Sequence, residues 1–237
     1  IHVRYEDTEE IYEEISKASQ KEATEILQKI YTAPVKENLI GDVIKKIKDS
    51  NSRCFASFVP ASTKRFAPVA VEAGCDSIVI QSTVTTARHN SKSLEGLVLS
   101  KIVESIKVPI IVGNTVTYNV SRELMETGIH GILVGVGPGS ACTSREVLGV
   151  GVPQVSATLE CSSARDDYFK LTGRYVSIIT DGGIRTGGEL CKSFVAGADA
   201  VMIGSPFSKT FESPAKGNHW GMATPHESLP RGTRIEV

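Results

Sequence analysis

The amino-acid sequence predicts an α/β fold made of repeated β/α units, and three observations support this prediction. Short apolar runs alternate with longer stretches of helix-forming residues. The runs are apolar throughout instead of alternating with polar residues, which is typical of parallel strands that are covered on both faces. One helix–glycine–strand junction also recurs three times along the chain.

Residues 1–39 are predicted to form a helical segment that precedes these units. Residues 5–31 are rich in charged helix formers, so we expect one or two surface helices there. The spacing of Ile11, Ile15 and Ile26 places them on an inward face. The glutamates at the beginning of this segment favour the N-terminus of a helix.

Residues 40–237 are predicted to form the β/α units of one domain. Helical stretches such as IGDVIKKIKDS, SLEGLVLSKIVESI and SRELMETG provide the crossovers that parallel strands require. The predicted strands, in chain order, are CFASFV, SIVIQS, PIIVGN, GILVGV, YVSIIT and AVMIGS.

The recurring junction reads EAGCDSIVI at Gly74, ETGIHGILV at Gly128 and VAGADAVMI at Gly197. Each glycine can end a helix in the left-handed conformation, and an apolar strand begins a few residues later. About six such units suit a (β/α)8 TIM barrel, which takes about 250 residues when complete. A doubly wound open sheet is the alternative architecture.

Composition predicts a soluble protein without a nucleic-acid or membrane partner. The formal net charge is -1, and 41% of the residues are hydrophobic and 22% charged. No basic surface is therefore expected to attract DNA, RNA or lipid, and no apolar run approaches the ~20 residues of a membrane helix. The five cysteines form no CxxC pair, which favours a reducing compartment, the cytoplasm, over a disulfide framework or a zinc site.

Polar or glycine residues follow each predicted strand. In a barrel the carboxyl ends of all strands share one rim, and active sites lie at that rim. We therefore expect these residues to converge in space although they are scattered in sequence: Gln81 and Ser82, Gly113 and Asn114, 135–140, 181–183, and Gly204 with Ser205.

The loops 181–189 and 203–207 together predict a phosphate site. They follow the last two predicted strands, and barrels commonly hold phosphate between the loops after strands seven and eight. Their backbone N–H groups and one hydroxyl are suitable donors, at Gly182, Gly183, Gly204 and Ser205. The alternative is that these glycines only form tight turns. Asp181 is predicted to accept hydrogen bonds from a ribose diol, with capping of the following helix as its structural alternative.

Cys142 is the candidate nucleophile, within the glycine-rich loop 135–154. An ordinary thiol is mostly protonated at neutral pH, so a nucleophilic cysteine needs a helix N-terminus or a nearby base. The sequence TSRE from Thr143 to Glu146 resembles a capping box, which predicts a helix beginning there. The other four cysteines lie beside strands or in helices and are predicted to be packing or surface residues.

These motifs resemble the inosine monophosphate dehydrogenase/GMP reductase family. The resemblance rests on GVGPGSACTSREVLGVGVPQ, DGGIRTGGELCKSFVAGADAVMIGSPF, Glu212 and HWGM, and it covers the chain from CFASFV onward. The ending HWGMATPHESLPRGTR is most similar to the dehydrogenase-related branch, which lacks regulatory CBS domains.

The resemblance implies a role for each matching position. Cys142 matches the cysteine that attacks C2 of the purine to form a thioimidate, Thr143 the adjacent catalytic threonine and Glu212 its acid partner. The phosphate contacts match Ser140, Gly182, Gly183, Gly204 and Ser205. Asp181 matches the ribose carboxylate, and Gly221 and Met222 match the segment that holds the base. Asn114 and Gln81 match strand-end positions on the cofactor side, where Gln81 replaces an aspartate. The carbonyls of Gly137, Gly139 and Cys142 match a potassium-binding loop.

The reaction implied is NAD(P)-dependent oxidation or reduction of IMP, XMP or GMP. Hydrolysis in the dehydrogenase direction needs an Arg-Tyr pair, but Arg231 is followed by glycine here, which favours reductive deamination of GMP by NADPH. Oxidation of IMP by NAD is the alternative direction. A non-redox phosphate-binding barrel or a regulator is the alternative of a different class, although a lyase of this fold would need a strand lysine and none is evident.

The family pattern also predicts that the chain is a fragment of a barrel. Its first two strands are expected to precede Ile1, and further sequence is expected beyond Val237. Because missing strands expose sheet edges, we expect the 237 residues alone to be unstable or inactive. The resemblance further implies a homotetramer or a larger homo-oligomer.

Overall fold

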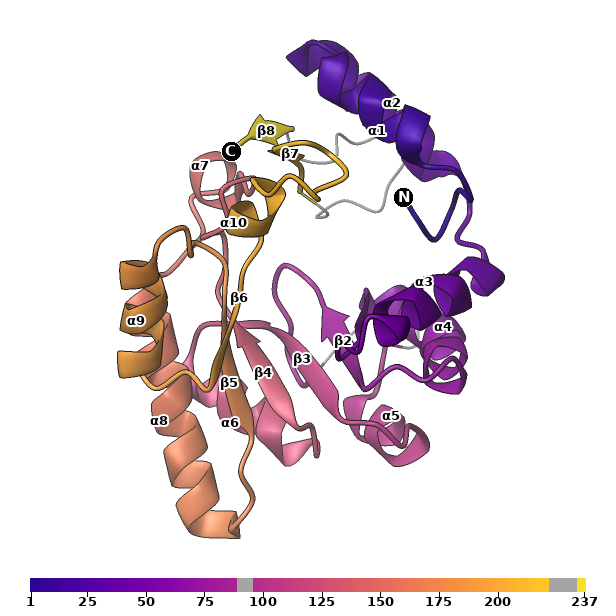
Figure 1. Cartoon of the computed structure of the whole chain (residues 1–237). Coiled ribbons are helices and arrows are strands. Elements are labelled where there is room, and N and C mark those ends of the chain that lie inside the picture. The colour runs from indigo at the N-terminus through magenta and orange to yellow at the C-terminus, as the bar shows by residue number, and fades with distance from the viewer. Residues whose placement is uncertain (89–95, 222–233) are drawn as a thin grey trace.

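Six parallel strands lie side by side in the order in which they occur along the chain (Figure 1). The computed structural model describes residues 1–88, 96–221 and 234–237. The strands are β1 (Phe55–Phe58), β2 (Ser77–Gln81), β3 (Ile110–Thr115), β4 (Gly131–Val134), β5 (Ser177–Asp181) and β6 (Ala200–Met202). A doubly wound sheet reverses its strand order at a switch point, and this sheet does not. The prediction of a (β/α)8 barrel is therefore confirmed, with six of its eight strands among the described residues.

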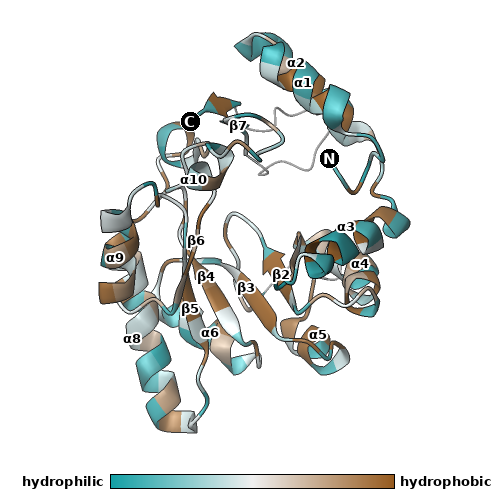
Figure 2. Ribbon diagram, viewed as in Figure 1, coloured by the Kyte–Doolittle hydropathy of each residue, from teal (hydrophilic) through white to brown (hydrophobic). Residues whose placement is uncertain are grey.

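Helices cover the outer face of the curved sheet (Figure 1). They are α3 (Glu37–Asp49), α4 (Pro60–Glu72), α5 (Leu99–Ser105), α6 (Tyr118–Glu126), α8 (Gln154–Thr172) and α9 (Gly187–Val195). In Figure 2 the strands of the sheet are mostly brown, that is hydrophobic, whereas the helices around them carry both hydrophobic and hydrophilic residues. The helix predicted over SLEGLVLSKIVESI is shorter than expected and begins at Leu99; residues 89–95 lie outside the described part of the chain.

The main hydrophobic core lies between the sheet and these helices. The strand register aligns Ile80 of β2, Val112 of β3, Ile132 of β4 and Ile178 of β5 in one row. All four side chains are fully buried, and each contributes roughly 1.5–3 kcal/mol through removal of apolar surface from water. The core explains why the strand sequences are apolar without interruption. In the described residues, no helix is both long enough and apolar enough to span a bilayer.

The first two helices, α1 (Glu9–Lys17) and α2 (Gln20–Thr32), form a hairpin apart from the outer layer (Figure 1). Their own small core contains Ile15, with Ile11 and Ile26 partly buried against it, so the predicted inward face is confirmed. The hairpin also contacts the C-terminal part of the chain. Trp220 Nε1 donates to the Tyr31 hydroxyl at 3.1 Å, and Arg234 Nη1 donates to the carbonyl of Ile15 at 2.5 Å.

Short elements lie at the rim formed by the carboxyl ends of the strands. They are α7 (Ser144–Val147), α10 (Ser205–Ser208) and the antiparallel pair β7 (Asn218–His219) and β8 (Ile235–Glu236). Each follows a strand-end loop or pairs with a segment that does, so most of the irregular backbone gathers at one end of the sheet.

The three predicted junction glycines adopt the left-handed conformation. Gly74, Gly128 and Gly197 have φ values of 91°, 93° and 96°, a region that costs a residue with a Cβ about 1–2 kcal/mol. The backbone at each junction therefore requires glycine, and the prediction is confirmed.

A second feature of the junction emerges only in the structure. The residue two positions after each glycine accepts a hydrogen bond from the beginning of the preceding strand. Asp76 Oδ2 accepts from Cys54 N–H at 2.8 Å, His130 Nδ1 from Ile110 N–H at 3.1 Å, and Asp199 Oδ2 from Ile178 N–H at 2.7 Å. These three acceptors tie adjacent units together at the end of the barrel opposite the rim.

The two aspartates of this set are ion-paired. Asp76 contacts Lys48 at 2.8 Å and Arg53 at 3.0 Å, and the hydrogen bond from Lys48 is the main reason that its pKa lies far below the usual range. Asp199 contacts the buried Arg165 at 2.9 Å. Asp76 therefore stays ionised as an acceptor over the physiological pH range.

His130 should make folding stability depend on pH. Its Nδ1 can accept the Ile110 N–H only when that nitrogen is unprotonated, and partial burial followed by the charge of Arg174 lowers its pKa below 6.5. The folded protein thus holds fewer protons than the unfolded chain, so stability is full above pH 6.5 and falls as the pH drops from 6.5 toward the lowered pKa. Urea unfolding at pH 7.5 and 5.5 measures this loss.

His130→Asn is the matched variant, because its Oδ1 retains an acceptor that does not titrate in this range. The variant should lose less stability than the wild type between the two pH values. An identical loss in both proteins would show that other groups cause it.

Candidate active site

Three loops that follow β4, β5 and β6 meet at the rim. The Ser140 hydroxyl lies 3.0 Å from the Ser205 hydroxyl, which joins the loop after β4 to the start of α10. A Cβ placed on Gly182 would lie 2.9 Å from Pro138 Cγ, so the loop after β5 packs closely on the loop after β4. The structure therefore brings together the segments that the sequence predicts to hold phosphate.

The converging loops present backbone donors that the protein itself does not use. The N–H groups of Gly182, Gly183, Gly204 and Ser205 donate no hydrogen bond to any residue that the structure describes. Gly182 and Gly183 have φ values of 90° and 79°, so the backbone there requires glycine. Gly204 has a negative φ, so its backbone conformation does not require glycine. A cluster of neutral donors of this kind is suited to an anion such as phosphate.

Asp181 lies beside this cluster and is held by two amides from other strands. Its Oδ2 accepts from Asn114 Nδ2 at 2.8 Å and from Gln81 Nε2 at 2.9 Å. Asn114 Nδ2 also donates to the carbonyl of Gly135 at 2.8 Å. In a flat sheet β2 and β5 would lie about 14 Å apart, so this contact depends on the curl of the barrel.

The other oxygen of Asp181, Oδ1, remains available. It accepts no hydrogen bond from a described residue, yet it is not among their buried unpaired atoms. Burial raises the pKa of Asp181, and the amides of Asn114 and Gln81 partly offset that rise. The site thus holds a carboxylate with one oxygen fixed by protein and one open to a ligand, as a ribose contact needs.

Cys142 is exposed on the loop after β4. Its N–H donates to the carbonyl of Gly139 at 3.0 Å, and its Sγ lies 3.3 Å from the Ser144 hydroxyl. The loop that carries it is the one that contacts both phosphate segments. The thiol is therefore accessible at the edge of the donor cluster. Of the other four cysteines, Cys54, Cys75 and Cys161 are buried and Cys191 is exposed, as predicted.

A helix begins at Ser144, directly after Thr143, as predicted, but the capping box itself does not form. Helix α7 is a single turn, and the Thr143 side chain makes no cap bond. The reason is the backbone: Thr143 has a ψ of 3°, whereas Ser19 and Thr186, which form complete capping boxes, have extended backbones with ψ near 165° and 161°. Sequence spacing alone does not set the conformation on which this motif depends.

Arg145 organises the cysteine loop, a role that sequence reasoning missed. Its Nε donates to the carbonyl of Val136 at 3.2 Å and its Nη2 to the carbonyl of Val152 at 2.5 Å. Gly137 and Gly151 leave room for its chain, because a Cβ on either would lie within 2.7 Å of Arg145 Cγ. The sequence feature that could have pointed to Arg145 is that no other lysine or arginine occurs between Arg122 and Arg165.

Gln154 was also missed. Its Nε2 donates to the carbonyls of Val134 at 2.6 Å and Asp181 at 3.3 Å, which ties the ends of β4 and β5 together. Its Oε1 is buried without a partner among the described residues. The available signal was a polar residue directly after Pro153 at the start of a long helix.

The remaining predicted residues are less tightly assembled. Thr143 and Glu212 are both exposed, and no hydrogen bond joins them within the described ranges. Gly221 is half-buried at the end of a described range, and Met222 lies outside the described residues. The carbonyl of Gly139 accepts the hydrogen bond from Cys142 N–H, and Gly137 lies two residues earlier on the same loop. No cluster of His, Cys, Asp and Glu suited to a metal occurs in the described part of the chain.

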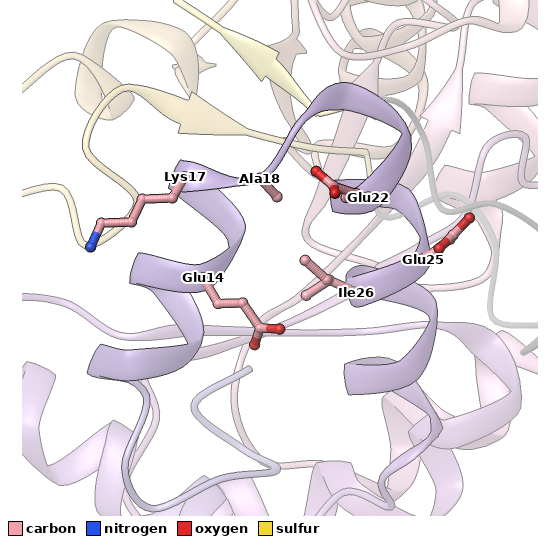
Figure 3. Close-up of a pocket in the computed structure, with 6 residues that line it drawn as sticks. All are labelled: Glu14, Lys17, Ala18, Glu22, Glu25 and Ile26. Carbon is pink, nitrogen blue, oxygen red and sulfur yellow. The ribbon is translucent and has the colours of Figure 1, made fainter.

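A hollow of about 460 Å³ between α1 and α2 is a poor candidate for the same ligand (Figure 3). Its lining includes the carboxylates of Glu14, Glu22 and Glu25, which would repel a phosphate. The ammonium of Lys17 is already paired with Glu13 at 2.5 Å. The rim therefore remains the candidate site for an anionic ligand.

Comparison with known proteins identifies related sequences and structures. The family model of the IMP dehydrogenase / GMP reductase domain matches residues 8–222. An uncharacterised oxidoreductase of Mycobacterium tuberculosis is 35% identical over 217 residues, covering 91% of this chain and 58% of that protein. The inosine-5′-monophosphate dehydrogenase of Cryptosporidium parvum is 43% identical over 150 residues, covering 63% of this chain and 35% of that enzyme.

A solved structure has the same fold. The crystal structure of an IMP dehydrogenase/GMP reductase-like protein from Corynebacterium glutamicum superposes with a TM-score of 0.89 at 33% identity. The match covers 99% of this chain and 62% of that one. The chain thus spans about three fifths of the length of these full-length relatives.

Gly182→Ala should damage the site, because a methyl group there meets Pro138 and the φ of 90° disfavours any side chain. We expect the free energy of unfolding to fall by about 1–2 kcal/mol. The stabilisation produced by added inorganic phosphate, measured as a shift in the urea midpoint, should also be lost.

Gly187→Ala, at the first residue of α9, is the control from the segment that follows the same strand. A Cβ there meets nothing within 4 Å and no unusual φ is involved, so stability and the phosphate effect should be retained. Equal behaviour of the two variants would contradict the packing described for Gly182.

Proposed function

The chain belongs to the IMP dehydrogenase / GMP reductase family, and we propose that it forms the larger part of the catalytic barrel of an oxidoreductase that acts on C2 of a purine mononucleotide. The observation that carries the proposal is the exposed thiol of Cys142, which is on the same loop that packs against a cluster of unused phosphate donors. A structural cysteine has no need of that neighbourhood.

In the proposed complex the nucleotide is held from three sides. Its 5′-phosphate binds the N–H groups of the loops after β5 and β6 and the hydroxyls of Ser140 and Ser205. Its ribose binds the open oxygen of Asp181. The base contacts the segment at Gly221 and Met222. Each hydrogen bond to a charged group contributes about 1.5–3 kcal/mol. Most of the binding free energy therefore comes from the phosphate and the ribose, which do not react.

The bond-making residue is Cys142. In reductive deamination its thiolate adds to C2 of GMP, the 2-amino group leaves as ammonia, and a thioimidate remains. Hydride addition at C2 followed by release of the thiolate then gives IMP. We propose that Thr143 and Glu212 donate the proton to the departing ammonia. Covalent catalysis of this kind divides one difficult displacement into two easier steps.

A nicotinamide dinucleotide supplies or accepts the hydride when it is bound. The rim offers it one acceptor, since Gln81 Oε1 accepts no hydrogen bond from the described residues, and a carboxamide could donate there. Asn114, in contrast, is 6% exposed and its amide is fully engaged. In the same proposal, the carbonyls of Gly137, Gly139 and Cys142 hold a potassium ion.

The direction that we favour is NADPH-dependent conversion of GMP to IMP. Arg231 is followed by glycine rather than by the tyrosine that water activation requires in the dehydrogenase. The opposite direction, oxidation of IMP to XMP by NAD, is favoured by the similarity to inosine-5′-monophosphate dehydrogenases. The two directions differ in both substrate and cofactor, so one assay separates them.

Turnover can be followed by absorbance at 340 nm with GMP plus NADPH in one reaction and IMP plus NAD in another. Cys142→Ser should reduce kcat in the productive reaction by at least about 10³-fold, because a hydroxyl cannot replace the nucleophile. Cys191→Ser, at the other exposed cysteine, should leave it unchanged.

Full turnover by Cys142→Ser would contradict covalent catalysis. Nucleotide binding without any redox turnover by the wild type would instead favour a non-redox phosphate-binding barrel or a regulator. Such a protein would use the same donor cluster without the thiol.

A further inference from the structure

Gln81 is placed to act on the ligand through another residue. It is the last residue of β2, and its Nε2 donates both to Asp181 Oδ2 at 2.9 Å and to Asn114 Oδ1 at 3.2 Å. Asn114 in turn donates to the same oxygen of Asp181. Asp181 Oδ2 therefore accepts from two amides, and the two amide side chains are also hydrogen-bonded to each other through Gln81 Nε2 and Asn114 Oδ1.

This arrangement fixes the rotation of the Asp181 carboxylate. The terminal torsion of an aspartate is broad and has no strong preference of its own, so its orientation depends on hydrogen bonds. With Oδ2 held by both amides, Oδ1 is the oxygen left without a described partner and open to solvent. Removal of either donor would leave the carboxylate plane held by one hydrogen bond instead of two, so that the plane could rotate away from the direction in which Oδ1 now points.

The length and the charge of residue 81 both matter. Gln81 reaches Asp181 from three strand positions away, and asparagine would be one methylene shorter. Glutamate would have the same reach but would place a second carboxylate within hydrogen-bond distance of the first. No charged side chain of the described residues contributes to the pKa of Asp181, so nothing nearby would compensate the added charge.

We propose that Gln81 is a positioning residue that orients Asp181 toward the ribose hydroxyls and so determines selectivity for ribonucleotides over 2′-deoxyribonucleotides. The proposal rests on the proposed function, because it assigns the open oxygen of Asp181 to the sugar. It gives Gln81 a role that is separate from any direct contact with the cofactor.

The first test compares Gln81→Asn with the wild type in the protein as it exists. The variant should raise KM for the ribonucleotide about tenfold, the effect of one hydrogen bond to a charged group. Its kcat should change less than about twofold, because the ribose contact is the same in the ground and transition states. Substrates that lack the 2′-hydroxyl provide the decisive comparison.

The wild type should prefer GMP over dGMP, or IMP over dIMP, by about tenfold or more, and Gln81→Asn should lose most of that preference. A residue with only a structural role would lower stability without altering the ratio. An unchanged ratio in a folded variant, checked by its urea midpoint, would overturn the proposal.

The second test uses Gln81→Glu. Two carboxyl groups this close share a proton, so KM for the ribonucleotide should fall as the pH is lowered and rise as it is raised. The wild type should show no such trend in KM. Asn51→Asp makes the same amide-to-carboxylate change on an exposed residue between α3 and β1, and it should behave like the wild type. A pH-independent KM in Gln81→Glu would count against the proposal.

Calorimetric binding of GMP, dGMP, IMP and dIMP separates this proposal from the catalytic one. If the wild type binds nucleotides with a ribose selectivity that Gln81→Asn loses, but neither protein turns any nucleotide over, the proposed reaction fails and the role of Gln81 stands. If turnover occurs but neither the binding nor the KM ratio depends on residue 81, the role of Gln81 fails and the reaction stands.

Discussion

The curl of the parallel sheet is the constraint on which the rest of the site depends. Side chains from β2, β3 and β5 meet at one carboxylate oxygen of Asp181, although strand spacing in a flat sheet would keep β2 and β5 about 14 Å apart. The same curvature brings the loops after β4, β5 and β6 close enough for Ser140 to contact Ser205. A relaxed, open sheet of identical sequence would retain its core and lose both features.

The two ends of the barrel differ in how their hydrogen-bonding groups are satisfied. At one end, side-chain acceptors at Asp76, His130 and Asp199 satisfy the N–H groups of strand beginnings. At the rim, by contrast, several N–H groups have no partner among the residues that the structure describes, and one oxygen of Asp181 accepts no hydrogen bond from them. Unused hydrogen-bonding capacity therefore concentrates where a ligand would supply the missing partners, and the opposite end provides the rigidity.

The sequence predicted the features that depend on local pattern. Uninterrupted apolar runs located the strands, glycines 74, 128 and 197 located the helix ends, and the barrel rule placed the strand ends together. The roles of Arg145 and Gln154 could not be predicted in this way, because they consist of contacts with backbone carbonyls that only the folded loop positions. The box at Thr143 failed for a related reason: the residue types were correct, but the surrounding loop imposed another backbone angle. The side-chain contacts made in loops therefore depend on tertiary structure more than the positions of the strands do.

The contact between Trp220 and Tyr31 links parts of the chain that are 189 residues apart. This contact joins the α1–α2 hairpin to the segment that follows β6. Trp220 is the sole tryptophan of the sequence, and it lies next to Gly221 at the rim. The protein therefore carries an intrinsic fluorophore whose emission reports whether its N-terminal hairpin is seated.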